Sequence, residues 1–208
     1  MNLSKIKIIT PVTALICICG CSIYRSPVPV ADYYYLNPYV DMGNVGKVIL
    51  IQPENNSVYP QISADVTNAL YEQIQKKQRF SLRVVPEEDP EWRSLELDVD
   101  SISQPQKLFI AAKTLRCDAI ITGEITQYVP YPHMVLGLRL KMIRCIDAKL
   151  LWAFEQVWDT ADKKTEYRIK KYLANQTRSG SETLGEQLVT VSSIKFVKFV
   201  AYEVALTF

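Results

Sequence analysis

The chain has 208 residues, of which 48% are hydrophobic and 22% are charged, values close to the average for globular proteins. They exclude long disorder, a collagen-like repeat and a disulfide-rich miniature protein, and the length suits one domain of ordinary size. The 24 basic and 22 acidic residues leave a net charge of +2, which is too even for a nucleic-acid-binding protein to be inferred from bulk charge.

The first twenty residues differ from the rest of the chain. Lys5 and Lys7 form a short cationic start, and a largely apolar run covers residues 8–19. This run is too short to cross about 30 Å of hydrocarbon but suits the core of a signal peptide. It ends in Ile-Cys-Gly-Cys at residues 18–21, which resembles the bacterial lipoprotein box.

The box predicts cleavage before Cys21, lipidation of Cys21 (palmitate among its acyl chains), and attachment to a membrane. The alternative is an ordinary secretory signal with unrelated cysteines. Ser22 follows, where such proteins retained in the inner membrane carry Asp, so the resemblance favours the outer membrane, on its periplasmic face. Loss of residues 1–20 removes two of the 24 basic residues and leaves a mature chain with balanced charges.

Residues 21–44 follow as an extended tether, rich in Pro and Tyr and without apolar periodicity. Two roles for the tyrosines at 33–35 stay open. They can rest at a membrane interface or on a neighbouring subunit, or they can form a strand-like arm on their own domain.

Residues 45–208 are predicted to form one α/β domain with helices against a mixed sheet. Val48–Ile51 is a continuous apolar run, typical of a strand buried on both faces. Helical periodicity follows, with Ser63 as the expected N-cap, and residues 80–85 alternate as a second strand that stops at Pro86. Ser103 and Gln106 suggest a capping box before a second helix.

Three long strands are expected at residues 119–129, 135–147 and 150–160. Their short connections require antiparallel neighbours. Trp152, Phe154 and Trp158 share a face of the last strand and form an aromatic ridge for a helix to cover. A basic helix near 162–176, a Ser/Gly loop over 177–185 and an apolar helix over 192–206 complete a β-α-β-α-β-β order with two C-terminal helices.

No pattern indicates catalysis or a cofactor. His133 is the only histidine and lies in a turn between proline and methionine, so neither a catalytic triad nor a zinc site has enough ligands. A glycine-rich phosphate loop between a strand and a helix is also missing from the sequence. We therefore expect no enzyme activity, no metal, no nucleic-acid partner and no small-molecule substrate.

Cys117 and Cys145 approach one another if the strands on either side of residues 130–133 pair as a hairpin. Position 117 then lies almost opposite 146, in a compartment where a disulfide can persist. Because a slip of one residue turns side chains to opposite faces, two buried thiols remain the alternative. Two free thiols in the unreduced native protein would exclude the bridge.

Charge is unevenly distributed along the domain. Residues 87–100 hold seven acidic side chains, whereas residues 162–178 hold six basic ones. One hypothesis is that this acidic loop and the basic helix meet between neighbouring subunits. The other is two solvated faces.

Three stretches of sequence, in order, are similar to one family. They are residues 48–57 (VILIQPENNS), residues 115–128 (LRCDAIITGEITQY) and residues 138–159, which include Asp-Ala-Lys-Leu-Leu-Trp. Together with the lipoprotein box they resemble the bacterial outer-membrane lipoproteins of the CsgG-like, LpoB-like and PelC-like superfamily. Lys149 stands where that family has Gly, and Cys117 where it has Gly or Ala. The resemblance covers residues 46–160, so the helical extension over 161–208 is not inherited from it.

The resemblance implies a β-α-β-α-β-β core and a periplasmic binding or assembly protein, with ring formation in several members. One hypothesis is therefore an oligomerising subunit or accessory factor of an outer-membrane export or assembly system, whose partners are the membrane, other copies of the chain and envelope proteins. The alternative is a monomeric binding module that regulates a periplasmic cell-wall enzyme. A hydrolase ranks below both.

Overall fold

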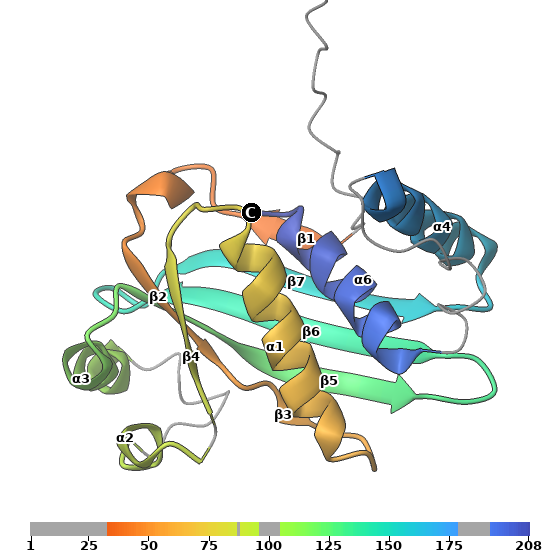
Figure 1. The fold of residues 1–208 in the computed structure, drawn as a ribbon. Helices are drawn as coiled ribbons and strands as arrows, with labels where there is room; N and C mark the ends of the chain where they lie inside the picture. The colour runs from red at the N-terminus through yellow and green to blue at the C-terminus, as the bar shows by residue number, and fades with distance from the viewer. Residues whose placement is uncertain (1–32, 87, 96–104, 179–191) are drawn as a thin grey trace, which may run out of the picture.

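The computed structural model describes residues 33–86, 88–95, 105–178 and 192–208. Its centre is a mixed sheet in the strand order β1-β7-β6-β5-β2-β4, with the two-residue strand β3 (Glu54–Asn55) paired to β5. The signal sequence, Cys21, Ser103 and the Ser/Gly loop beyond 178 lie outside the described residues. The predicted fold class, a mixed α/β domain, is confirmed for those that are described (Figure 1).

The first half of the sheet is parallel. Strand β2 (Lys47–Ile51) pairs in parallel with both β4 (Ser81–Val85) and the start of β5 (Ala119–Val129). From Val48 onward β2 is buried on both faces, as its continuous apolar run predicted. Its side chains alternate between two hydrophobic clusters, one under α1 (Gln61–Gln75) and α6 (Ser193–Ala205), the other under α2 (Pro90–Arg93) and α3 (Pro105–Leu115).

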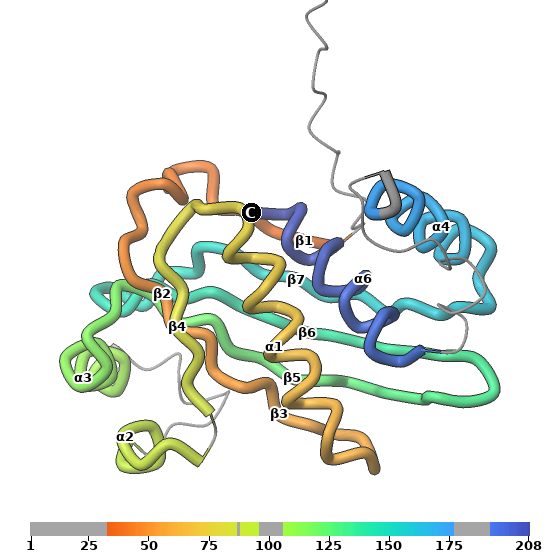
Figure 2. The backbone as a smooth tube through the Cα atoms, viewed as in Figure 1, coloured from red at the N-terminus to blue at the C-terminus, as the bar shows by residue number. Residues whose placement is uncertain are grey.

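The second half is antiparallel. Strands β5, β6 (Val135–Arg144) and β7 (Leu150–Asp159) form a meander, within one to three residues of the predicted ends. A bulge at Thr126 interrupts the register between β5 and β6. On one face of this meander α1 and α6 pack side by side, and α4 (Lys163–Arg178) covers its end near β7 (Figures 1 and 2).

The aromatic ridge on β7 lies beneath α6, as predicted. Trp152, Phe154 and Trp158 stack in sequence with ring centroids 5.9 and 5.7 Å apart. The two indole N–H groups donate to residues near the C-terminus: Trp152 to Thr207 Oγ1 at 2.9 Å and Trp158 to Glu203 Oε2 at 2.6 Å. The ridge is therefore held by polar contacts as well as by burial.

The expected N-cap at Ser63 is wrong. Helix α1 begins at Gln61 after Pro60, and no side chain caps it. Ser63 is buried in the first turn, where its hydroxyl donates to the carbonyl of Pro53. The preceding loop packs against the helix and supplies an acceptor inside the domain, so Ser63 links loop to helix instead of capping it.

The tyrosine segment forms a strand. Strand β1 (Tyr34–Leu36) pairs antiparallel with β7, and Tyr34 lies opposite Phe154. Of the two roles left open for residues 33–35, the structure therefore shows the strand-like arm on the chain's own domain. All three tyrosines are still exposed.

Candidate functional site

A cleft of about 530 Å³ opens at the end of the sheet where β5 begins and β6 ends. Three segments that are far apart in sequence enclose it: the loop after β1, helix α3, and the ends of the β5–β6 pair. Its lining residues are Tyr39, Val40, Asp41, Asn44, Val45, Phe109, Ala112, Cys117, Asp118, Arg144, Cys145 and Ile146.

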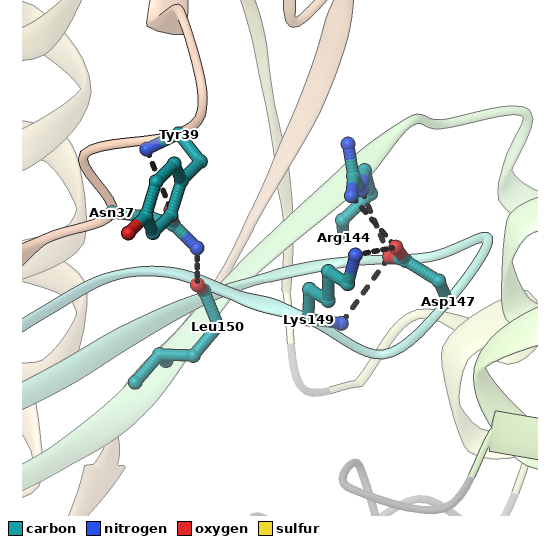
Figure 3. Close-up of polar contacts among 6 residues, drawn as sticks. All are labelled: Asn37, Tyr39, Arg144, Asp147, Lys149 and Leu150. Atoms are coloured by element: carbon teal, nitrogen blue, oxygen red, sulfur yellow. Dashed lines mark hydrogen bonds and ion pairs between the residues drawn. The ribbon is translucent and has the colours of Figure 1, made fainter.

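Asn37 holds the first wall of the cleft on β7. Its backbone N–H donates to Leu151 O at 2.8 Å, and its side-chain amide donates to Leu150 O at 3.1 Å (Figure 3). The Asn37 Oδ1 atom accepts the backbone N–H of Tyr39 at 3.0 Å, which forms an Asx turn. A polar anchor therefore presents the Tyr39 ring at the cleft, where it is 95% exposed.

The second wall is the turn between β6 and β7. Arg144 donates twice to Asp147, from Nε to Oδ1 at 2.8 Å and from Nη2 to Oδ2 at 2.6 Å (Figure 3). The Lys149 backbone N–H donates to Asp147 Oδ1 at 3.3 Å, and the Lys149 Nζ atom pairs with Asp147 Oδ2 at 3.5 Å. A bidentate pair of this kind restricts the geometry of the turn.

The backbone of this turn corrects two expectations. The strand predicted to reach residue 147 ends at Arg144, because Asp147 draws the chain into a turn. The left-handed backbone conformation, which favours glycine, occurs at Ala148 with φ of 56°, one residue before Lys149. Lys149 therefore does not occupy the position that needs glycine.

The Arg144 guanidinium lowers the pKa of Asp147 to about 2 through its hydrogen bonds, and the Lys149 backbone and charge add to this shift. A lowered pKa in the folded state means that the carboxylate stabilises the fold above its ordinary pKa. This contribution is lost as the pH falls through about 2.

We expect Asp147→Asn to reduce the free energy of unfolding by about 0.5–1 kcal/mol at pH 7, since the carboxylate is a third exposed and solvent screens the pair. The difference from the unmodified chain should vanish near pH 2. Urea unfolding at both pH values measures it. Asp65→Asn, on the exposed side of α1, serves as the control and should change little.

Asp118 ties the floor of the cleft to the sheet. Its Oδ2 atom accepts the backbone N–H of Lys47 at 2.7 Å, which joins the start of β2 to the start of β5. A Cβ atom at Gly46 would lie 2.6 Å from the same oxygen. Glycine at position 46 therefore leaves room for this carboxylate beside the strand.

Cys117 and Cys145 meet in the wall of the cleft, as the hairpin predicted. Both are buried and unbridged, with the Sγ atoms 3.6 Å apart, so the structure contains the two buried thiols and not the proposed disulfide. The hydrogen bond between the thiols, burial and the neighbouring Asp118 carboxylate raise the pKa of Cys145. This thiol is therefore protonated at neutral pH.

The rim of the cleft is apolar and exposed. Besides Tyr39, Ile146 is 78% exposed and Phe109 is 48% exposed. Exposed apolar side chains are ordinary when scattered, but these three line one cleft together with the polar groups of Asp118 and Arg144. Such an arrangement suits binding of apolar side chains from another protein surface.

The only histidine of the sequence does not line the cleft. His133 lies at the opposite end of the β5–β6 hairpin, with Nε2 3.7 Å from Asp159 Oδ2 and both side chains largely exposed. Among the residues that the structure describes, no three His, Cys, Asp or Glu side chains come together as a metal-ligand set. None of the described helices has the length and apolar character needed to span a membrane.

Sequence reasoning identified only the cysteine pair of this cleft and the turn that contains Asp147. It did not identify Tyr39, Phe109, Arg144 or Ile146 as members of a shared site. One part of the site could have been predicted. Because position 146 lies opposite 117 in the predicted hairpin, the turn between β6 and β7 had to lie beside the end of α3. No pattern in the sequence indicated that residues 37–45 line the cleft, because their position depends on the pairing of β1 with β7.

The fold and cleft define the class: a mixed-sheet α/β domain with a cleft at one end of the sheet. No protein-family model matches the chain, and no curated protein matches its sequence.

The solved structures to which the chain is similar include the following three. The PelC dodecamer from Paraburkholderia phytofirmans has a TM-score of 0.44 at 12% identity, over 65% of this chain and 86% of that one. Lipoprotein GNA1162 from Neisseria meningitidis has a TM-score of 0.42 at 13% identity, over 65% and 99%. The LpoB C-terminal domain from Escherichia coli has a TM-score of 0.37 at 16% identity, over 58% and 86%.

Proposed function

We propose that this chain is a lipid-anchored, non-catalytic envelope protein on the periplasmic face of the outer membrane. In this role it is an oligomerising subunit or accessory factor of an export or assembly system. The lipoprotein box that ends at Cys21 supports the lipid anchor. The three motifs over residues 46–160, in the order in which the resembling lipoproteins have them, support the role in an export or assembly system.

The observation that carries the binding role is the apolar rim of the cleft. Tyr39, Phe109 and Ile146 are exposed and line the same cleft. The Asn37 anchor fixes the backbone next to Tyr39, and the Arg144–Asp147 pair restricts the turn that contains Ile146. A preformed apolar patch loses little conformational freedom on association. In the proposed role it receives a surface of a neighbouring subunit.

Mass measurement in solution tests this role. The sample is the mature chain from residue 21, with Cys21→Ser to prevent acylation, studied by sedimentation equilibrium over a range of concentrations. We expect an oligomer, and we expect Tyr39→Asp with Ile146→Asp to convert it into monomer, because two buried carboxylates would be unpaired at the contact.

The matched control is Val58→Asp with Tyr131→Asp, which alters two exposed apolar residues outside the cleft. This pair should leave the oligomer intact. A strict monomer at the highest concentration would refute oligomerisation and favour the alternative, a monomeric module that binds a periplasmic cell-wall enzyme through the same rim.

The anchor is tested separately with the full chain. Cys21→Ala should move the protein from the outer-membrane fraction to the soluble periplasmic fraction. A Cys21→Ala variant that still fractionates with the outer membrane would overturn the lipid anchor.

A further inference from the structure

Helix α4 has two chemically distinct faces. Thr165, Ile169, Tyr172 and Leu173 are buried, and the Tyr172 ring contacts Phe199 of α6 at 5.7 Å between centroids. At 3.6 residues per turn the opposite side carries a separate group of exposed residues. That group, here the outer face of α4, consists of Lys163, Lys164, Tyr167, Lys170 and Lys171.

The outer face has a fixed orientation. Arg168 of α4 pairs with Glu203 of α6 at 3.2 Å, and Glu203 also accepts the indole N–H of Trp158 in β7 at 2.6 Å. This buried polar contact adds to the apolar packing of α4 on α6. The helix therefore presents the same residues to the outside of the domain.

The chemistry of the outer face suits a surface of anionic headgroups. Lys163 and Lys170 both pair with Glu166, at 3.2 and 3.0 Å, which offsets part of their charge. Lys164 and Lys171 are exposed on the side of the helix away from Glu166. The Tyr167 ring, 68% exposed, projects among the lysines, and tyrosine rings and lysine stems are well suited to the headgroup region of a bilayer.

Helix α4 lies near Tyr33, the first described residue after the predicted anchor at Cys21. Because β1 is antiparallel to β7 and Glu155 N donates to Tyr33 O at 3.0 Å, Tyr33 lies toward the carboxyl end of β7. Helix α4 begins four residues after that end, and Figure 1 shows α4 beside it. Eleven residues lie between Cys21 and Tyr33, and the twelve steps from one to the other span at most about 40 Å at full extension.

We propose that the outer face of α4 contacts the membrane that holds the anchor and binds anionic phospholipid headgroups. This inference rests on the proposed lipid anchor, since the short tether keeps this end of the domain near the bilayer. Each lysine close to an anionic surface adds to binding. The acidic segment 87–100 of a second copy is the competing occupant, and several of its carboxylates lie outside the described residues.

Vesicle sedimentation with the mature Cys21→Ser chain tests the headgroup contact without the lipid. The vesicles are phosphatidylethanolamine with phosphatidylglycerol, and phosphatidylethanolamine with phosphatidylcholine as the neutral comparison. We expect binding only to the anionic vesicles, weakening as salt is raised. Lys164→Glu with Lys171→Glu should reduce the binding constant at least about thirtyfold, and Lys164→Arg with Lys171→Arg should retain it.

The matched control is Lys113→Glu with Arg116→Glu at the end of α3, which changes net charge equally on the side of the domain away from α4 (Figure 1). The control should bind nearly as well as the unmodified chain. Equal losses in both variants, or no preference for anionic vesicles, would overturn the proposal. A change of oligomer mass in the α4 variant without a change in vesicle binding would assign this face to the acidic segment instead. None of these results depends on whether Cys21 is acylated, so failure here is distinguishable from failure of the anchor.

Discussion

Replacing Glu203 with alanine is expected to lower the free energy of unfolding by about 3–5 kcal/mol. Glu203 is buried on α6, where its Oε2 atom pairs with Arg168 Nη1 of α4 and accepts the Trp158 indole N–H of β7. Alanine would leave a nearly buried guanidinium and a buried N–H group without their acceptor. The cost is mainly the desolvation of those two groups, not the attraction lost.

Urea unfolding monitored by tryptophan fluorescence measures this loss. Glu72→Ala is the matched control, because Glu72 also pairs across two helices, with Lys198 at 3.3 Å, but both side chains are more than 40% exposed. We expect its effect to stay below about 1 kcal/mol. A Glu203→Ala loss no larger than that of Glu72→Ala would show that the buried contact does not hold α4 on the domain.

The protonation of Glu203 provides a second readout. Burial raises the pKa of Glu203, and the Trp158 hydrogen bond and the Arg168 charge oppose that shift. With a raised pKa in the folded state, the contribution of this group to stability is largest below its ordinary pKa and falls as the pH rises through the folded value. Glu203→Gln, which still offers Trp158 an acceptor, should remove this pH dependence and cost less than Glu203→Ala at neutral pH.

Replacing Gly123 with alanine is expected to cost about 3 kcal/mol, the upper part of the usual range for overpacking. A Cβ atom there would overlap the carbonyl of Arg139 and lie 2.8 Å from the Cα atom of Leu140. Both are backbone atoms of the paired strand β6, which cannot rotate away. Strands β5 and β6 would have to separate in the middle of the sheet.

Gly43→Ala is the matched control for this prediction. Gly43 lies in the 3-10 helix Met42–Asn44. A Cβ atom there would lie 3.3 Å from the carboxylate of Asp41, which is an exposed side chain. We expect a change within about 0.5 kcal/mol. If Gly123→Ala unfolds at the same urea concentration as Gly43→Ala, the close approach of β5 and β6 is not required for stability.

Gly123 also shows what a sequence pattern conveys. It lies inside the strand that alternation predicts over residues 119–129, where nothing in the pattern requires a glycine. The reason for glycine is the backbone of Arg139 and Leu140. That reason becomes visible only when β6 is placed beside β5.

The large elements were predictable because their signals are local. A continuous apolar run marked β2, alternation and short connections marked β5, β6 and β7, and helical spacing marked α1, α3, α4 and α6. The expectations that failed involved side-chain hydrogen bonds, which the periodicity of apolar residues does not specify. Ser63 donates to Pro53 of the preceding loop instead of capping its own helix, and Asp147 turns the chain at a point where alternation alone would continue the strand.

By itself, then, the sequence determined the fold class, the strands of the meander, the aromatic ridge under a helix and the proximity of Cys117 to Cys145, since periodicity and hairpin register specify all four. Only the tertiary structure decided that residues 34–36 pair with β7, that the two Sγ atoms lie 3.6 Å apart, and that Tyr39, Phe109 and Ile146 line one cleft. The average composition and near-neutral charge conceal this cleft and the basic outer face of α4. The cleft arises because packing brings distant segments together, which the pattern of any single segment does not specify. The packing of α4 on α6 decides which side of the predicted basic helix is exposed.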